Sequence, residues 1–151
     1  MKNIVIFDLD GTIALVDERR KLSKNSNGKI NWDLFFNPKY IDLDKPNQAV
    51  IKILRVLKMR SFKVMILSGR LETTKNATLQ WLKKNDVKFD EIKMRKNNPK
   101  GKYISDVELK ESWLNEIGKE NIMCVFDDRT KIVEMWRRNG LTCFQVAKGD
   151  F

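Results

Sequence analysis

The sequence contains no histidine, and this absence removes several kinds of catalytic site at once. A Ser-His-Asp or Cys-His apparatus is excluded, and so is zinc bound through imidazole. Only two cysteines are present, Cys124 and Cys143, and each stands in an apolar run typical of a core strand. We therefore expect two buried, reduced thiols rather than a disulfide or a metal site. Any chemistry must use carboxylates, lysine, arginine, hydroxyl groups or a hard metal ion.

Long apolar runs and nucleotide-binding loops are also missing. No run approaches the roughly 20 residues that a membrane-spanning helix needs, and the short apolar start leads directly into two aspartates rather than a signal-peptide cleavage site. We expect no membrane partner and a cytoplasmic location. Neither Gly28-Lys29 nor Gly101-Lys102 has the upstream glycine of a GxxxxGK[ST] loop, which excludes a nucleoside-triphosphate kinase site of that type.

Positive charge, in contrast, is abundant. The chain has 30 basic and 20 acidic residues, for a formal net charge of +10. Such an excess suggests a polyanionic partner such as nucleic acid. Solubility combined with a codon bias toward Lys, Asn and Ile explains the composition equally well. The positions of the charges along the chain must decide between these two explanations.

Apolar periodicity predicts an alternating α/β chain. Strands are expected at 2–8, 62–67, 90–94, 121–126 and 141–147, and helices at 47–60, 73–84, 105–117 and 129–138. Continuous apolar strands that alternate with helices predict a three-layer, Rossmann-like fold with a central parallel sheet. With 151 residues we expect one domain, 1–151, in which residues 13–46 form a small flap or insert.

Polar residues gather where the predicted strands end. Ligands of open α/β sheets bind beyond the carboxyl ends of the strands. Three of these ends read Asp8-Leu9-Asp10-Gly11-Thr12, Ser68-Gly69-Arg70 and Asp127-Asp128-Arg129. Four carboxylates without histidine or cysteine indicate a Mg²⁺ site. The neighbouring serine, arginine and lysine side chains suit a phosphate group.

These motifs carry a resemblance to a known family. The sequences "DLDGT", "ILSGR", a later lysine and "FDD" resemble the four-part signature of haloacid-dehalogenase-like (HAD) phosphatases. The stretch "DKPN" and the tail "DDRTKIVEMWRRNGLTCFQVAKGDF" are similar to the 3′-phosphatase domain of phage-type polynucleotide kinase 3′-phosphatases. The resemblance covers essentially the whole chain, lacks the kinase half, and implies a HAD fold without a large cap domain.

The resemblance also implies roles for the acids. Asp8 would be the nucleophile that forms an aspartyl-phosphate, and Asp10 would protonate the leaving oxygen and then activate water. The expected Mg²⁺ ligands are Asp8, Asp10, Asp127 and Asp128. The structural alternative is that these aspartates serve as turn or helix-cap residues.

The remaining candidates would hold the phosphate. They are Thr12, Arg19, Ser68, Gly69, Arg70, Asp106 and Lys110. The resemblance makes Lys110 the phosphate-neutralising lysine and Asp106 its partner one helical turn away, although a solvated ion pair at this spacing is the plain alternative. Lys102 is a rival for Lys110, and Arg20 is a rival for Arg19. Trp136 and the C-terminal Gly-Asp-Phe are expected to be structural.

The predicted fold brings many of the basic residues to one rim. This predicted basic rim consists of Arg19, Arg20, Lys21, Arg95, Lys96, Lys100, Lys102 and Arg129. Such a rim suits the phosphates of a nucleic-acid end. The leading hypothesis is a Mg²⁺-dependent phosphatase acting on DNA or RNA 3′ ends, with a separate kinase or ligase as partner. The alternatives are a mononucleotide or small-metabolite phosphatase and an inactive nucleic-acid-binding module.

Overall fold

The computed structural model describes residues 2–150 and is built around one parallel sheet. The strands are β1 (Ile4–Phe7), β4 (Lys63–Leu71), β5 (Glu91–Arg95), β6 (Ile122–Asp127) and β7 (Cys143–Gln145). Their order is β5-β4-β1-β6-β7, and every neighbouring pair is parallel. β1 therefore lies in the middle, with β4 and β6 on either side. The predicted parallel sheet is confirmed.

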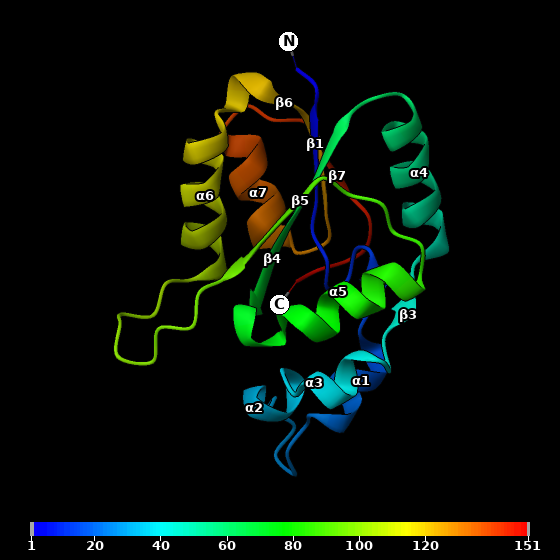
Figure 1. Ribbon diagram of the computed structural model, residues 1–151. Helices are drawn as coiled ribbons and strands as arrows, with labels where there is room; N and C mark the ends of the chain where they lie inside the picture. The colour runs from blue at the N-terminus through cyan, green and yellow to red at the C-terminus, as the bar shows by residue number, and fades with distance from the viewer. Residues whose placement is uncertain (1, 151) are drawn as a thin grey trace.

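Helices cover both faces of this sheet. Helices α4 (Gln48–Met59) and α5 (Lys75–Lys84) lie on one side, and α6 (Asp106–Ile117) and α7 (Thr130–Arg138) lie on the other (Figure 1). Short 3-10 turns, η1 (Glu72–Thr74) and η2 (Lys119–Asn121), precede α5 and β6. The result is the expected three-layer α/β fold without a large cap domain.

The apolar sequence of β1 explains its central place. Val5 and Phe7 pack into the cluster with α4 and α5, whereas Ile4 and Ile6 pack into the cluster with α6 and α7. Successive side chains of a strand point to opposite faces, so a strand covered on both faces must be apolar throughout. Because β1 is packed on both faces, it fixes the position of the residues that directly follow it.

Most predicted boundaries agree with the structure, and the exceptions are informative. Helix α6 begins with a capping box, in which the Ser105 and Glu108 side chains each bond the other residue's backbone N–H. β7 is shorter than predicted. β4 continues through Leu71 rather than ending near residue 67, and its register against β5 shifts between Ser68 and Leu71. Ser68, Gly69 and Arg70 thus belong to the strand itself rather than to a following turn.

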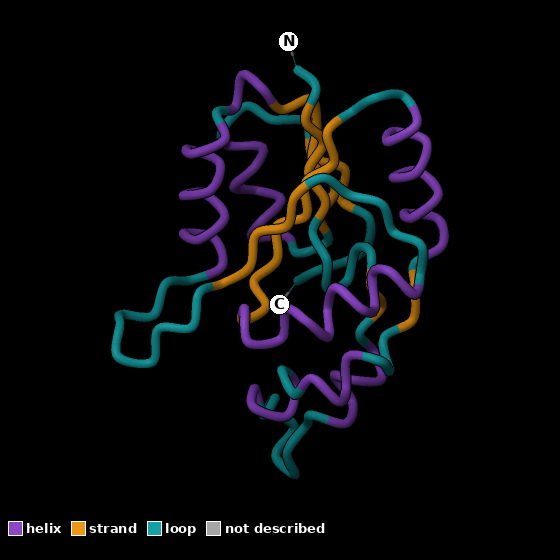
Figure 2. Tube along the Cα trace, viewed as in Figure 1, coloured by secondary structure: helices purple, strands orange, loops and turns teal. Residues whose placement is uncertain are grey.

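Residues 13–46 form a small substructure beyond the sheet. Its base is an antiparallel pair of two short strands, β2 (Ala14–Leu15) and β3 (Lys45–Pro46), which brings both ends of the segment together. Between them lie α1 (Asp17–Leu22), α2 (Trp32–Phe35) and α3 (Pro38–Ile41), beside the carboxyl end of the sheet (Figure 2). Phe35 and Ile41 join the main core. Among residues 2–150, no helix has the length and apolar character needed to span a membrane.

Candidate active site

The chain turns sharply after β1 and brings its first aspartate beside β6. The Asp8 N–H donates to the Phe126 carbonyl at 2.9 Å, which extends the sheet pairing to Asp8. Gly11 then adopts φ +85°, and a Cβ at this position would overlap the Asp128 carboxylate. Only glycine combines this backbone conformation with such a close approach. The "DGT" turn is therefore fitted to the acidic end of β6.

Three buried aspartates meet at this point. Asp8, Asp127 and Asp128 each offer a carboxylate oxygen, and these oxygens lie within 4.8 Å of one another. We call these three residues the acidic triad. The Thr12 hydroxyl lies 3.4 Å from both Asp8 Oδ2 and Asp128 Oδ1. Three converging hard oxygen donors are the ligand type that Mg²⁺ prefers, so the triad fits the predicted metal.

Lys110 places a positive charge against the acidic triad. Its Nζ donates to Asp8 Oδ1 at 2.7 Å and to Asp127 Oδ2 at 3.0 Å, and its side chain is 4% exposed. Lys102, the rival considered from the sequence, is fully on the surface. The location of Lys110 on α6, one turn into the helix, carries its long side chain to the edge between β1 and β6.

The protonation behaviour of the triad shows an excess of negative charge. Burial and the nearby Asp127 charge raise the pKa of Asp8 well above its usual value, against the effect of Lys110. Burial also raises the pKa of Asp128. Burial opposes the charged form of Lys110, but Asp127 and Asp8 prevail and raise its pKa. One ammonium for three carboxylates leaves a net negative site, which a divalent cation would neutralise.

Asp10 lies apart from the acidic triad and faces two arginines. Its Oδ1 accepts from Arg19 Nη2 at 2.7 Å and from Arg70 Nε and Nη2 at 2.9 and 2.5 Å. Burial alone would raise the pKa of Asp10, but Arg70 and Arg19 outweigh it and lower the pKa to about 2. Asp10 is consequently a carboxylate at neutral pH. Asp10 was predicted to be a metal ligand, but its carboxylate is not part of the acidic triad.

A fourth member completes this second cluster. Asp44 accepts from Arg19 Nε at 3.0 Å through Oδ1, and from Arg70 Nη2 at 2.9 Å through Oδ2. Asp44 and both arginine side chains are completely buried. For Asp44, burial prevails over the two arginines and raises the pKa to about 6. Two guanidinium groups and two carboxylates form a nearly neutral network, which we call the Arg19–Arg70 cluster.

The predicted place of Arg19 in the basic rim is wrong, because its side chain is completely buried. Arg19 also donates to the Phe35 carbonyl at 3.1 Å and stacks on the Phe35 ring, and Arg70 donates to the Thr78 hydroxyl at 3.0 Å. Both guanidinium groups are occupied by protein partners because each side chain is enclosed between the sheet end and residues 13–46. In this arrangement they position Asp10. Arg20, the rival for Arg19, is half-buried.

Asp106 also has partners other than the expected one. Lys110 bonds Asp8 and Asp127, whereas Asp106 pairs with Arg95 at 2.5 Å and Arg129 at 2.9 Å. The reason is that Lys110 points into the sheet end, while Asp106 at the first turn of α6 faces the neighbouring strand ends. Asp106 packs so closely on Gly69 that a Cβ there would lie 2.7 Å from Asp106 Oδ1. The Ser68 hydroxyl, also buried, accepts from the Arg70 N–H at 3.1 Å.

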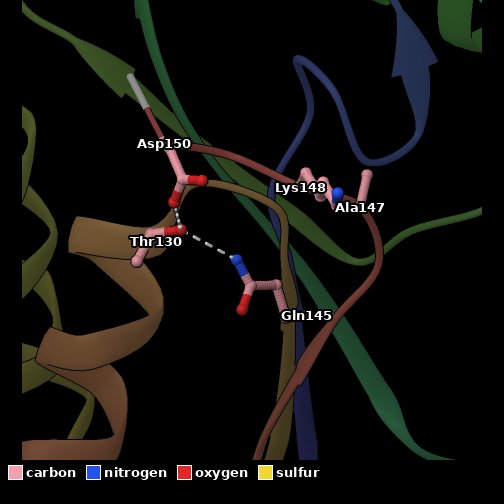
Figure 3. A pocket seen from close by; sticks show the side chains of 5 residues that line it. All are labelled: Thr130, Gln145, Ala147, Lys148 and Asp150. Atoms are coloured by element: carbon pink, nitrogen blue, oxygen red, sulfur yellow. Dashed lines mark hydrogen bonds between the residues drawn. The ribbon is translucent and has the colours of Figure 1, made fainter.

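Residues near the C-terminus contact the loop that carries Asp128. The Gln145 amide donates to the Asp128 carbonyl at 3.0 Å, and the Thr130 N–H donates to the Gly149 carbonyl at 2.9 Å. An open depression of about 510 Å³ lies beside this contact. Its lining residues are Thr130, Gln145, Ala147, Lys148 and Asp150. Figure 3 shows Thr130 between Gln145 and Asp150, with its hydroxyl hydrogen-bonded to both side chains. The expected structural role of the tail fits residues 149–150, and Phe151 lies outside the described residues.

Comparison with known proteins now identifies the chain's relatives. The family model described as "Polynucleotide kinase PNKP phosphatase domain" matches residues 2–151. The chain belongs to this family. It is therefore a phosphatase domain of HAD type, and the resemblance stated from the motifs is confirmed.

Solved and curated relatives agree with this membership. The chain is 34% identical to a chain of the "Pnkp1/Rnl/Hen1 complex", with a TM-score of 0.77 over 97% of this chain and 46% of that one. In the "Pnkp1/Rnl/Hen1 RNA repair complex" the values are 35%, 0.75, 97% and 43%. A "Putative bifunctional polynucleotide kinase/RNA ligase" of Autographa californica nuclear polyhedrosis virus is 27% identical over 95% of this chain and 19% of the viral protein. The chain thus spans less than half of each relative.

Two residues of the candidate active site in this PNKP-type phosphatase domain were not identified from the sequence. Asp44 stands in the "DKPN" stretch, which marked the family but suggested no contact. Trp136 was expected only in the core, yet its indole Nε1 also donates to Asp127 Oδ2 at 3.2 Å. An acid two residues before a proline and a tryptophan on an apolar helix face are each ordinary, so neither signals a role in sequence.

Proposed function

We propose that this chain is a Mg²⁺-dependent phosphomonoesterase that removes phosphate from the 3′ ends of nucleic acids. The observation that carries the proposal is the acidic triad with Lys110 in its centre, in a member of the PNKP phosphatase family. The proposal treats 1–151 as one catalytic domain, with 13–46 as a flap at its entrance.

Asp8 is the proposed nucleophile. Lys110 binds its Oδ1, whereas Oδ2 has a long contact of 3.4 Å with the Thr12 hydroxyl. Oδ2 would attack phosphorus in line with the leaving 3′ oxygen, forming an aspartyl-phosphate while the P–O bond to the sugar breaks. Lys110, together with the proposed phosphate-contacting residues Thr12, Ser68 and Gly69, would stabilise the charge on the transferred group. Water attack on phosphorus then restores the Asp8 carboxylate and releases inorganic phosphate.

Asp10 is the proposed acid and base. Its two arginines hold it ionised, which suits the second step, in which it takes a proton from the attacking water. For the first step it must carry a proton. A phosphate dianion bound beside it would raise its pKa, because a like charge disfavours the ionised form. Arg19, Arg70 and Asp44 are positioning residues in this account, since they fix the direction of the Asp10 carboxylate.

The acidic triad is the proposed holder of Mg²⁺. Asp8, Asp127 and Asp128 supply the carboxylates, and Asp127 is oriented by Lys110 and Trp136. When bound, the ion neutralises the triad and the phosphate charge, which makes attack by one anion on another possible. The Asp10 carboxylate is left out of this set because it lies outside the acidic triad, with its Oδ1 bonded to both arginines.

Exposed lysines are the proposed contacts of the nucleic-acid backbone. Lys21, Lys96, Lys100 and Lys102 are on the surface of segments that border the carboxyl end of the sheet. The absence of a large cap domain leaves access for the end of a macromolecule. By analogy with the relatives found in kinase and ligase proteins, a separate kinase or ligase is the proposed partner. Two buried free thiols, Cys124 and Cys143, suit the reducing cytoplasm as the place of action.

A phosphate-release assay tests the proposal. A 3′-phosphorylated oligonucleotide, the same sequence with a 5′-phosphate and the matching 3′-mononucleotide are each incubated with the protein and Mg²⁺. We expect orthophosphate release to be fastest from the 3′-phosphorylated oligonucleotide and to slow with added salt, because backbone contacts are salt-sensitive. Equal, salt-independent rates on the mononucleotide would favour a small-metabolite phosphatase. Tight oligonucleotide binding without turnover of any phosphate ester would favour an inactive binding module.

A further inference from the structure

We propose that Tyr103 is a stacking platform for a nucleotide base of the substrate, next to the phosphate site. The tyrosine lies in the loop of residues 96–104, between β5 and α6, and 76% of it is exposed. A large aromatic side chain this exposed contributes little to the packing of the chain itself. The inference rests on the proposed nucleic-acid substrate and deepens it by naming a residue that contacts a base.

The tyrosine ring has a fixed support on one side. The Arg95 guanidinium carbon lies 5.2 Å from the ring centroid, in a cation–π arrangement. Arg95 is itself held by the Ile104 carbonyl at 2.6 Å, the Gly69 carbonyl at 3.3 Å and Asp106 at 2.5 Å. A base that stacks on the exposed ring would therefore meet a surface that is already positioned, which reduces the entropy lost on binding.

The same contacts connect the platform to the candidate active site. Asp106 joins Arg95 to Arg129, which directly follows Asp128 of the acidic triad. Gly69, whose carbonyl accepts from Arg95, follows Ser68 at the end of β4. Figure 1 shows the loop projecting from the side of the sheet where β4 and β5 end. A phosphate at the triad and a base at Tyr103 would thus approach the same edge of the sheet.

The loop has the composition of a single-strand contact. Residues 96–104 read "KNNPKGKYI", with three lysines and no acid, and all three lysines are exposed. Lysines that contact phosphates and an aromatic ring that contacts a base are the combination by which proteins bind single strands with little sequence preference. We infer that the loop guides an unpaired 3′ end, and that any of the four bases can stack on Tyr103.

Comparison of Tyr103→Ala with Tyr103→Phe tests the platform. Both are assayed on a 3′-phosphorylated oligonucleotide and on matched oligonucleotides that carry an abasic site at the last or the penultimate nucleotide. Stacking contributes about 1–3 kcal/mol per base, so we expect kcat/KM of Tyr103→Ala to fall about 5- to 150-fold on the full oligonucleotide. On one of the abasic substrates, kcat/KM of the wild type should fall by a similar factor. On the same substrate, kcat/KM of Tyr103→Ala should stay close to its value on the full oligonucleotide. Tyr103→Phe should retain the wild-type values on every substrate.

The outcomes separate this inference from the proposed function. If the wild type releases 3′-phosphate from the oligonucleotide but Tyr103→Ala is equally active, the platform is wrong and the phosphatase proposal stands. The same conclusion follows if the activity of Tyr103→Ala relative to the wild type is reduced by the same factor on the full oligonucleotide and on every abasic substrate. If the wild type releases no phosphate from the oligonucleotide, both are overturned. Thermal melting verifies that Tyr103→Ala is folded, and a melting temperature close to the wild type is expected because the ring is exposed.

Discussion

The Nζ atom of Lys110 lies 2.7 Å from Oδ1 of Asp8, although 102 residues separate them along the chain. This contact joins α6 to the end of β1 and places one positive charge among the three carboxylates of the acidic triad. It also divides the two oxygens of Asp8, one bonded to the lysine and the other directed away from it. The Arg19–Arg70 cluster beside it holds the other carboxylate of the same turn, Asp10.

Replacement of Lys110 by methionine should remove most activity. The methionine side chain fills a similar volume but leaves the triad and the bound phosphate without their internal cation. Loss of one such electrostatic contact in a buried site lowers kcat by about 100- to 1000-fold. The assay is orthophosphate release at saturating Mg²⁺, with Lys83→Met, on the exposed side of α5, as the matched control. A kcat of Lys110→Met close to that of the control would contradict the role of Lys110.

Asp8→Asn should abolish activity in the presence of Mg²⁺ and, in the metal-free protein, increase stability at neutral pH. The pKa of Asp8 is raised on folding, so its ionised form is disfavoured in the folded state. The penalty is present above the folded pKa and disappears as the pH falls toward the unfolded value of about 4. The melting temperature of Asp8→Asn should therefore exceed that of the wild type by a few degrees at pH 7, where about 1 kcal/mol corresponds to about 2–4 °C.

The pH series supplies the control for this prediction. The stability advantage of Asp8→Asn should shrink steadily as the pH is lowered toward 4. Added Mg²⁺ should raise the melting temperature of the wild type more than that of the variant, because binding to the folded state stabilises it. A variant less stable than the wild type at pH 7 in the presence of a chelator would show that the excess negative charge is not a penalty.

Asp44→Asn should destabilise the protein moderately. The amide of asparagine cannot accept at both of the positions where Asp44 accepts from Arg19 and Arg70, so a buried guanidinium N–H is left without an acceptor, at a cost of about 1–3 kcal/mol. The larger cost of breaking a fully favourable buried pair is not expected, because burial raises the pKa of Asp44 to about 6 and thus already disfavours its charge. Asp86→Asn is the control, because Asp86 is 64% exposed and pairs with Arg55 at 3.7 Å; exposed pairs contribute at most about 1 kcal/mol. Equal free energies of unfolding for the two variants in denaturant titrations would refute the buried network.

Gly11→Ala and Gly28→Ala form a matched pair that tests the turn after β1. Both glycines have positive φ, +85° and +79°, so both alanines incur the same backbone strain, about 1–2 kcal/mol. Only at Gly11 would the new Cβ also overlap Asp128, whereas Gly28 has no atom within 4 Å of that position. We expect the Mg²⁺ concentration for half-maximal activity to rise about tenfold for Gly11→Ala alone. The same Mg²⁺ dependence in both variants would exclude the proposed contact with the metal-binding carboxylate.

The sequence was sufficient to predict the parallel sheet, helices α4 to α7 and the residues of the acidic triad, although it grouped Asp10 with them. Continuous apolar strands and capping signals act locally, and the carboxyl ends of parallel strands must share an edge. This geometry made Asp8 and Asp127 neighbours before the structure was known. Lys110 was also found, because the family motif places a lysine on that helix.

The partners of the arginines could not be predicted in the same way. Arg19 pairs with Asp44, 25 residues away, and Arg70 pairs with Asp10, 60 residues away. These contacts depend on how residues 13–46 fold over the end of the sheet, and that segment has no apolar periodicity to fix its shape. The end of β4 was misjudged for a related reason, since the strand was predicted to end at residue 67 but continues through Ser68-Gly69-Arg70 and pairs with β5 again at Leu71 after a register shift.

The most direct test of the proposed function uses one oligonucleotide with a distinguishable phosphate at each end. It is incubated with wild-type protein or Asp8→Asn, with Mg²⁺ or with a chelator, and the products are resolved by mass. We predict that the wild type with Mg²⁺ removes the 3′-phosphate and leaves the 5′-phosphate, and that chelator or Asp8→Asn stops the reaction. Removal of the 5′-phosphate, or full activity of Asp8→Asn, would contradict the account.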